Sequence, residues 1–294
     1  MNFQIISDGA CDLLPEYTDA HNVLVVPFYV TFDGTNYVKE GTGISHDEFY
    51  QRMAQNHEIP KSSLPSTGDY IDAFMPSVKA GIPIICICIT SNFSGSYNSA
   101  CMARQTILDD YKDAQIAIID SALNTMSEAL LVHEVVRMRD NGLSFSECVH
   151  KINDIKTTGR IYFTVGSLEY LIKNGRIGKL ASIAGDKLGI QPLIVMKDGD
   201  ITLAGATRSR KKAKSSIIKL LQKYISDANI NVKDYTFLVG TGFQLEEADE
   251  FTKELEDTLN IQCADIPSRI GTTIGCHTGP YPLGVALLKK YDVN

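Results

Sequence analysis

The 294-residue sequence predicts an α/β fold of two α/β domains, in which a mostly parallel sheet flanked by helices precedes a smaller α+β domain. Short apolar strands alternate with helical segments in the first half, which is the pattern of a parallel sheet covered on both faces. The second half has a β-hairpin among longer helices. We therefore expect domains over residues 1–158 and 159–294, with the boundary near Thr157-Thr158-Gly159.

Apolar runs bounded by turn and capping residues define the elements of the first half. Pro15 opens a helix at a position where its missing N–H is not needed, and Ser45 precedes another helix with capping-box spacing. Further helices are expected from near Ser94 to Tyr111 and over Thr125–Asp140. Strands are expected in FQIIS, NVLVVPFYVTF, IPIICICIT and AQIAIID.

The second half begins with a predicted helix over residues 146–156, the strand GRIYFTV and a short helix that ends near Gly175. Asp198-Gly199 marks the turn of the hairpin. A long helix, the strand YTFLVGTG and a helix over Gln244–Leu259 follow. The sequence then continues with IQCADIP, a glycine-rich loop and LGVALLKK.

The composition excludes several classes of partner. A net charge of −7 and a pI near 5.4 argue against nucleic acid or an anionic membrane as the main partner. No segment approaches the roughly 20 apolar residues of a membrane span, so no stable membrane insertion is expected. The first apolar run is too short for a signal peptide. Seven cysteines without a CxxC pair, two of them (Cys86 and Cys88) on one face of a buried strand, indicate a reduced, cytoplasmic protein.

A cluster of hydroxyl residues, ITSNFSGSYNSA, follows a buried strand. In open α/β sheets, ligands bind beyond the carboxyl ends of the strands. A helix beginning near Ser94 would offer free N–H groups and a positive dipole end, and Ser91 and Ser96 would add hydroxyl donors. An ordinary N-cap needs only one serine. The surplus of hydroxyls therefore favours an anion-binding site.

Two other segments are candidates for this site. The stretch from Pro60 to Thr67 is also rich in hydroxyls, but its pattern alone indicates a loop in which Ser66 or Thr67 caps the next helix. His277 lies among glycines, in a turn without helical context, where a histidine is more often functional than on a helix face.

Common enzyme signatures are incomplete. His133-Glu134 begins a metalloprotease spacing that Arg137 breaks, and Asn92 stands where a nucleophile elbow before Ser94 would have glycine. The dinucleotide fingerprint and the phosphate-binding P-loop are absent from the sequence. Aspartates after predicted strands, namely Asp8, Asp12 and Asp120, are commonly caps and turn formers.

Taken in order, five motifs resemble the DegV family of bacterial fatty-acid-binding proteins, some of which present fatty acid to a fatty acid kinase. The resemblance spans nearly the whole chain. Each motif alone is weak, but their order is specific. They are SDGACDLLP at 7–15, PKSSLPS at 60–66, SGSYNSA at 94–100, LEYLIKNGRI at 168–177 and RSRKKA at 208–213.

The resemblance implies a lipid tunnel between the two domains. The first domain would carry the head-group loops, and the second would cover the acyl chain. The family's carboxylate ligands map onto Ser62, Ser94 and His277, with Ser63 and Gly95 as additional candidates. The sequence departs from the family pattern at three places: Ser62 replaces threonine, Tyr281 after Gly279-Pro280 replaces glycine, and Thr125-Met126-Ser127 replaces Ser-Met-Gly. The last two bear on tunnel shape and therefore on acyl preference.

The chemistry of these residues suits a long-chain fatty acid such as palmitate. Burial of about 14 methylenes contributes roughly 11 kcal/mol before ordering costs. The carboxylate is expensive to desolvate unless several donors meet it. Hydroxyls, helix N–H groups and an imidazole supply donors without a fixed charge. We therefore expect a lipid-binding carrier that needs no cofactor or metal, rather than an enzyme.

A basic run stands out in this acidic chain, because five cations fall within Arg208–Lys214. They lie where a helix is expected to begin, and cations there oppose the helix dipole. The simplest interpretation of the basic run is a solvated surface segment without a binding role. By resemblance the run lies near the tunnel mouth, where Arg208 and Lys211, joined by Arg176, would meet an acidic surface of a fatty acid kinase catalytic subunit.

Two other functions stay open from the sequence. One is a serine hydrolase or acyltransferase with Ser94 as nucleophile, His277 as base and Asp8 or Asp120 as the orienting acid. The other is a sensor of small anions that uses the same helix end.

Overall fold

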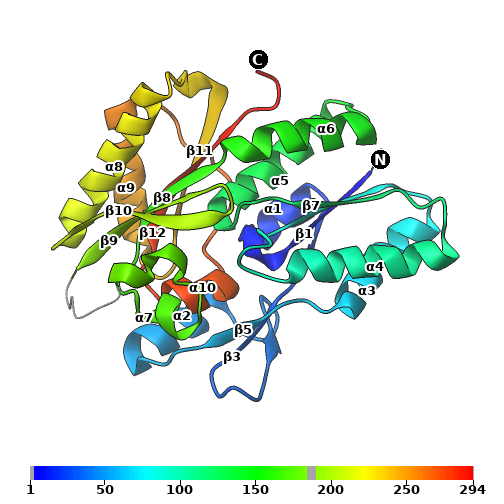
Figure 1. Ribbon diagram of the computed structural model, residues 1–294, viewed down its shortest axis with the longest axis horizontal. Helices are drawn as coiled ribbons and strands as arrows, with labels where there is room; N and C mark the ends of the chain where they lie inside the picture. The colour runs from blue at the N-terminus through cyan, green and yellow to red at the C-terminus, as the bar shows by residue number, and fades with distance from the viewer. Residues whose placement is uncertain (1–2, 184–189, 294) are drawn as a thin grey trace.

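The computed structural model describes residues 3–183 and 190–293 and confirms the α/β fold class (Figure 1). A four-stranded parallel sheet has the order β2-β1-β6-β7. The chain visits β1 in the middle first and adds strands on both sides, with helical connections between them. Its strands are β1 (Gln4–Asp8), β2 (Val23–Val26), β6 (Ile84–Cys88) and β7 (Ile116–Asp120).

A five-stranded antiparallel sheet has the order β10-β9-β8-β12-β11. The predicted hairpin is present in this sheet. Its two turn residues, Asp198 and Gly199, both have positive φ, 51° and 77°, as a type I′ turn requires. The strands are β8 (Arg160–Thr164), β9 (Gln191–Lys197), β10 (Asp200–Thr207), β11 (Tyr235–Thr241) and β12 (Leu283–Lys289).

A small antiparallel sheet has the order β4-β3-β5, and its strands β3 and β5 lie at the bottom of the view in Figure 1. It consists of β3 (Tyr29–Thr31), β4 (Val38–Lys39) and β5 (Lys61–Ser63). The sequence pattern predicted a loop at β5. That prediction was wrong because the pairing partner of β5, β3, lies thirty residues away and leaves no local signal.

The α-helices largely follow the predicted segments. They are α1 (Pro15–Ala20), α2 (His46–Asn56), α3 (Thr67–Lys79), α4 (Ser96–Asp110), α5 (Thr125–Asp140), α6 (Phe145–Ile155), α7 (Glu169–Lys173), α8 (Arg210–Asp227), α9 (Leu245–Leu259) and α10 (Thr272–Thr278). The described residues also form short 3-10 helices, namely η1 (Gly9–Cys11), η2 (Lys156–Thr158), η3 (Gly178–Ile183) and η4 (Val232–Asp234). None of the described helices combines the length and apolarity needed to cross a membrane.

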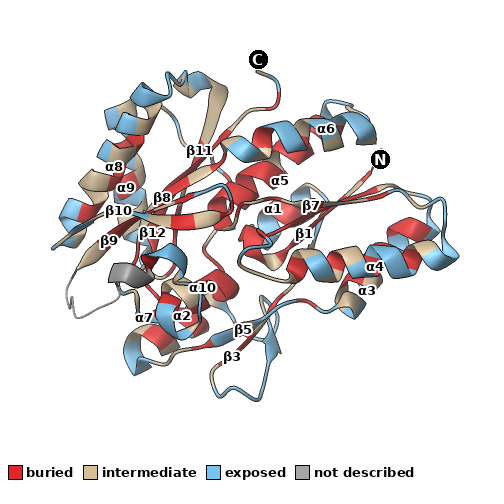
Figure 2. Ribbon diagram, viewed as in Figure 1, coloured by how far each residue is buried: buried red, intermediate tan, exposed pale blue. Residues whose placement is uncertain are grey.

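Helix α5 joins the two large sheets into one core. It packs against β1 on one side and against β11 and β12 on the other, and most of its residues are buried (Figure 2). One apolar cluster contains Ile5 of β1, Leu131 of α5, and Ile194 and Ala286 of the second sheet. Helices α8 and α9 cover the outer face of the second sheet. The division at residues 158 and 159 stays a prediction.

Two helix boundaries differ from the prediction. α4 begins at Ser96, two residues later than expected, because the N–H groups of Phe93 and Ser94 bond back to the Thr90 carbonyl in a turn. His277 lies in α10, where only a turn was expected. Phe49 and Tyr50 pack so closely on Gly275 that a side chain there would collide with them, which explains a glycine inside this helix.

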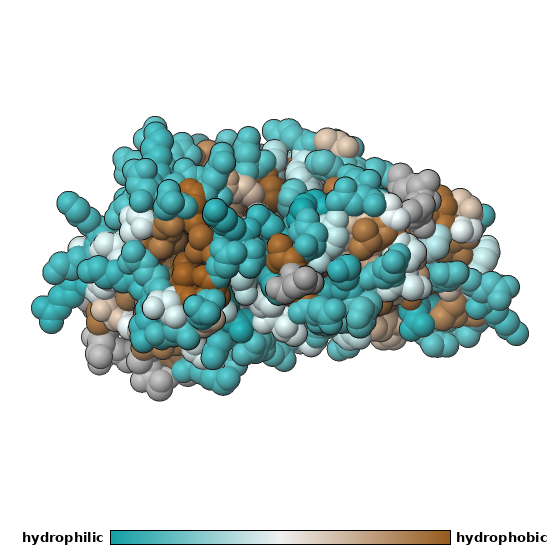
Figure 3. Space-filling view, turned by 90° about the horizontal axis from the view of Figure 1, so that it is seen from above, coloured by the Kyte–Doolittle hydropathy of each residue, from teal (hydrophilic) through white to brown (hydrophobic). Residues whose placement is uncertain are grey.

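The molecular surface seen in Figure 3 is mostly hydrophilic, with hydrophobic residues in separate patches. Among the described residues, large apolar side chains with more than a third of their area exposed include Leu64, Met102, Ile172 and Leu203. All seven cysteines are free, and Cys86 and Cys88 are fully buried, as expected for core residues.

Candidate functional site

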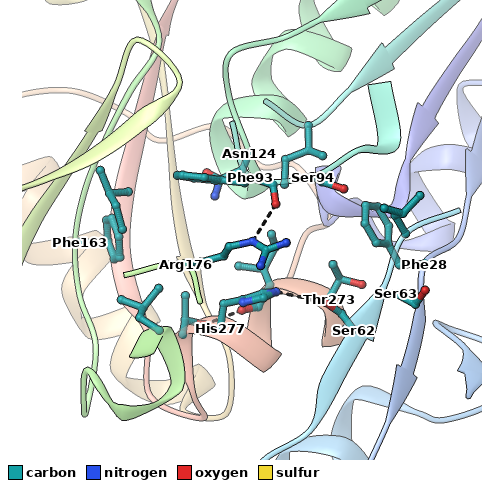
Figure 4. Close-up of a pocket in the computed structure, with 16 residues that line it drawn as sticks. Phe28, Ser62, Ser63, Phe93, Ser94, Asn124, Phe163, Arg176, Thr273 and His277 are labelled. Atoms are coloured by element: carbon teal, nitrogen blue, oxygen red, sulfur yellow. Dashed lines mark hydrogen bonds between the residues drawn. The ribbon is translucent and has the colours of Figure 1, made fainter. Parts of the chain in front are cut away.

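A cavity of about 220 Å³ lies between the parallel sheet, the small sheet, α10 and the second sheet. Its wall combines apolar and polar side chains (Figure 4). The apolar ones are Phe28, Leu64, Ile89, Phe93, Phe163, Leu171, Ile201 and Ile274. The polar ones are Ser62, Ser63, Ser94, Asn124, Arg176, Thr273, His277 and Thr278.

The structure brings Ser62, Ser94 and His277, far apart in the sequence, to this one cavity. The Ser62 Oγ of β5 lies 3.1 Å from Nε2 of His277, which stands in the last turn of α10. The other ring nitrogen, Nδ1, is buried and has no hydrogen-bond partner among residues 3–183 and 190–293. Burial, reinforced by the nearby Arg176 charge, lowers the pKa of His277 to about 4. The imidazole is therefore neutral at neutral pH, with one N–H to donate.

Ser94 lies in the loop between β6 and α4, where its Oγ accepts a hydrogen bond of 3.2 Å from the Ser96 N–H. The hydroxyl proton remains available to a ligand. Ser63 also lines the cavity. Gly95, the other additional candidate, is the N-cap of α4 and is not part of the cavity wall; it packs beside Leu64.

The serines around Ser94 do not all face the cavity, because Ser91 and Ser96 contact aspartates at the strand ends. Ser96 is fully buried, and its Oγ donates to Asp8 Oδ2 at 2.6 Å and lies 2.6 Å from the Tyr70 hydroxyl. Ser91 is exposed, and its N–H donates to Asp120. The expectation that Ser91 and Ser96 also face the ligand was therefore wrong. Ser94 is the serine of this loop that lines the cavity.

Asp8 fixes the loop that carries Ser94. Besides Ser96, its Oδ2 accepts from the Ile89 N–H at 3.1 Å, and its Oδ1 accepts from Ala10 at 3.2 Å. Burial raises the pKa of Asp8 to about 6, although these hydrogen bonds favour the ionised form. The pKa of the neighbouring Glu128 is raised well above its usual value, first by burial and then by the Asp8 charge.

Two further carboxylates hold the start of α10. Glu40 accepts from the Thr272 hydroxyl at 2.9 Å and from both the N–H and the hydroxyl of Thr273, at 2.9 and 3.0 Å. Asp12 accepts from the Gly271 N–H at 2.9 Å. Negative charge at a helix N-terminus is favourable, whereas burial raises the pKa of both carboxyls. Together they set the position of the helix that carries His277.

Arg176 borders the cavity and is exposed. Its Nε donates to the Phe93 carbonyl at 2.8 Å, and its Nη1 donates to the Asn174 carbonyl at 3.1 Å. In Figure 4 it lies between the Phe93–Ser94 loop and α10. The guanidinium therefore ties the turn after α7 to the loop that carries Ser94.

The basic run at the start of α8 is partly neutralised. Arg210 forms a bidentate ion pair with Glu247 and donates to the Tyr281 carbonyl, and Lys214 lies near Glu247 and Glu250. Arg208 and Lys211 are exposed and make no ion pair with any described residue. Neither lines the cavity. Their role in docking a partner stays a prediction.

The predicted serine-enzyme geometry is not formed among the described residues. The side chain bonded to His277 is Ser62, not Ser94. Asp8 and Asp120 accept hydrogen bonds from backbone and serine groups elsewhere, and neither orients the imidazole. Within the same described ranges, no group of three or more His, Cys, Asp or Glu side chains could hold a metal ion.

Sequence reasoning missed the apolar wall and the support of α10. Phe28, Phe163 and Ile201 have the pattern of ordinary core or strand residues, and nothing local shows that they face a cavity. Glu40 follows a two-residue strand and contacts α10 more than 230 positions away. The glycines and threonines just before His277 were the one feature of the sequence that could have indicated close packing of this segment.

Comparisons with known proteins cover almost the whole chain. A sequence model of the uncharacterised proteins of the DegV family matches residues 2–290. The DegV domain-containing protein SA1258 of Staphylococcus aureus is 30% identical over 286 residues, covering 97% of this chain and 98% of that protein. The protein CA_C0948 of Clostridium acetobutylicum is 31% identical over 97% of this chain and 98% of its own length.

Solved structures agree with these matches. A stearic-acid-binding protein of Eubacterium ventriosum is 46% identical, and the two structures superpose with a TM-score of 0.94 over 99% of each chain. A DegV protein of Thermus thermophilus, 22% identical, shares the fold, with a TM-score of 0.86 over 98% of this chain and 100% of its own. The motifs, the fold and these matches together place the chain in the DegV family.

Proposed function

We propose that this protein binds a long-chain fatty acid, such as palmitate, with its carboxylate held by Ser62, Ser94 and His277. The observation that carries the proposal is the convergence of these three side chains, from β5, the loop before α4 and the end of α10, in one otherwise largely apolar cavity. The cavity would enclose the carboxylate and the adjoining part of the acyl chain, as part of the tunnel between the two predicted domains.

The donors at this end suit a carboxylate. Two hydroxyls and a neutral imidazole carry three donor protons, and the Ser62–His277 hydrogen bond uses one of them. Two donors therefore remain for the carboxylate while that bond is kept, and three if the ligand breaks it, which offsets the cost of removing the carboxylate from water. His277 is neutral because burial lowers its pKa, so the head group meets no permanent charge from the ring. A carboxylate beside it would raise that pKa, so binding at pH values between about 4 and the raised pKa would be accompanied by proton uptake.

The relatives support this ligand class. The protein of Eubacterium ventriosum, 46% identical over nearly the full length, binds stearic acid. A structure of a DegV protein from Ruminococcus gnavus, which shares the fold at 20% identity, was refined with vaccenic acid. A shared fold and a similar sequence along 99% of the chain favour a ligand of the same kind here.

The direct test is to denature the purified protein, extract it and identify what is released by mass spectrometry. We expect a long-chain fatty acid, or uptake of added palmitate or oleate by protein that was stripped first. Recovery of only phosphate, a sugar or nothing, together with no uptake, would refute the proposal and favour the anion-sensor alternative. Covalent labelling of Ser94 by a serine-directed phosphonate would instead favour the hydrolase.

We further propose that the protein acts as a carrier in fatty acid metabolism or lipid transport and presents the bound carboxylate to a fatty acid kinase catalytic subunit. The exposed cations Arg208 and Lys211, together with Arg176 at the cavity edge, would meet an acidic partner surface. Such a pair would associate faster at low salt.

Kinase presentation is tested with Arg208→Ala and Lys211→Glu. Both variants should bind fatty acid normally but support slower partner-dependent phosphorylation of it, with the largest loss at low salt. Lys219→Glu, on the same helix α8, is the matched control for a charge reversal outside the basic run. Rates equal to wild type for both variants at every salt concentration would show that the run is an ordinary solvated surface.

A further inference from the structure

A second, smaller chamber of about 40 Å³ adjoins the first cavity. The two share the wall residues Asn124, Phe163, Ile274 and Thr278. In Figure 4, Phe163 lies on the side of the cavity opposite Ser62 and Ser63. The inner chamber therefore adjoins the part of the cavity that is remote from the proposed head-group site.

The outer cavity is too small for the whole ligand. A dry cavity of about 150 Å³ holds one benzene ring, so a cavity of about 220 Å³ has room for roughly nine carbons at the same density. A long-chain fatty acid has more carbons than that. The inner chamber is the adjoining space, but its volume of about 40 Å³ admits only one or two carbons unless a side chain moves.

Met126 is the unbranched, flexible side chain in this chamber. Its neighbours in the wall are branched, cyclic or short, whereas methionine has three rotatable bonds and adapts to irregular space. It lies against Gly240 of β11, which is paired directly with Gly284 of β12, so neither residue of this pair places a side chain in the chamber. A Cβ on Gly240 would lie 2.4 Å from Met126 Cγ and 2.9 Å from Sδ.

The backbone before Met126 is fixed rather than adaptable. Thr125 has a φ of 42°, a region that a β-branched residue rarely occupies, and its hydroxyl donates to the buried Asp12 carboxylate. Met126 is the second residue of α5, which is itself packed between the two large sheets. A ligand can therefore displace the Met126 side chain much more easily than the helix that carries it.

We infer that Met126, lying on Gly240, closes the far end of the tunnel and sets the acyl chain length. This inference rests on the proposed fatty acid binding. The methyl end of a sufficiently long ligand crosses from the outer cavity into the inner chamber and displaces the thioether from Gly240. Chains that end before Met126 leave the thioether in place.

The test measures the affinity of stripped protein for saturated fatty acids from laurate to behenate. Met126→Ala removes three heavy atoms and should lengthen the preferred chain by about two carbons. Affinity for stearate relative to palmitate should then rise roughly tenfold, since each of the two additional buried methylenes contributes about 0.8 kcal/mol. Met126→Ile conserves volume but is stiff at χ1, and should shift the preference toward shorter chains.

Met138→Ala is the matched control, because Met138 is buried in the same helix but does not line either chamber. It should leave the chain-length profile unchanged, with folding of every variant verified by circular dichroism. If both Met126 variants bind fatty acid with the wild-type profile, the inference is overturned while the proposed function stands. If wild-type protein binds no fatty acid of the series, both are overturned.

Discussion

Three side chains of ordinary chemistry define the candidate site. Ser62, Ser94 and His277 lie together because the fold brings them to one cavity, and burial keeps the imidazole neutral. Motif resemblance identified all three from the sequence. The local pattern could not separate Ser94 from Ser91 and Ser96, because their different tasks depend on Asp8 and Asp120, which belong to other strands.

The three head-group residues should act as a unit. Ser62→Ala, Ser94→Ala and His277→Ala are each expected to weaken palmitate binding by roughly 1–3 kcal/mol, the typical cost of losing one donor to a charged group. Their effects should not add, because they share one carboxylate. Titration calorimetry measures this, with Ser91→Ala, an exposed serine of the same loop, as the control. Unchanged affinity in all three variants would refute the head-group assignment.

Asp8 should make stability fall as pH rises. Its pKa is about 6 in the folded protein against 3.8 for an unperturbed carboxyl, so between these values the folded state binds more protons than the unfolded state. Unfolding free energy then decreases with pH across this window, by on the order of 3 kcal/mol in total. Above about pH 6 the effect levels off.

The variant Asp8→Asn, which cannot titrate, removes this contribution together with the effect of the Asp8 charge on Glu128. Urea unfolding at a series of pH values should show Asp8→Asn gaining stability relative to wild type from about pH 4 to pH 6. The buried histidines are common to both proteins and cancel in the difference. A difference that is constant with pH would mean that burial of Asp8 does not govern its ionisation.

At the scale of elements, apolar runs and caps predicted most helices and strands. Periodicity is a local property, which is why α2, α3, α5 and the β9–β10 hairpin could be placed from the sequence. α10 and β5 could not, since a seven-residue helix with an internal glycine and a three-residue strand exist only because distant partners hold them. Both elements carry site residues.

Glu40 should act on the ligand through α10. The substitution Glu40→Gln removes one acceptor for the Thr272 and Thr273 groups and the negative charge at the start of α10. Because α10 carries His277, we expect palmitate affinity to fall by about 1 kcal/mol. The loss should disappear when His277 is already alanine, because the role of Glu40 is to position that residue. A double-mutant cycle measures this coupling, and Glu48→Gln, on the exposed side of α2, is the control. Equal losses in both backgrounds would reduce Glu40 to a purely structural role.

At the scale of the whole molecule, the cavity lies where three sheets meet, so a ligand there contacts elements from both halves of the chain. Saturating fatty acid should therefore raise the melting temperature of stripped protein. At a free concentration one hundred times Kd the gain is about 2.7 kcal/mol, because the ligand binds only the folded state. Thermal melts of wild type and of the Ser94→Ala, His277→Ala double variant compare this directly, and an equal shift in both would place the ligand elsewhere.

The position of α5 has a consequence for how the protein can move. Helix α5 packs against both large sheets and is part of the core of each. Separating the two halves of the molecule would therefore expose apolar surface on both of them. We therefore expect the ligand to enter and leave through movements of loops and side chains at the edge of the cavity. A hinge motion that separates the two halves of the molecule is not expected. For the same reason residues 159–294 expressed alone should aggregate. A soluble fragment that unfolds cooperatively would contradict this and show that the second sheet does not need α5 in order to fold.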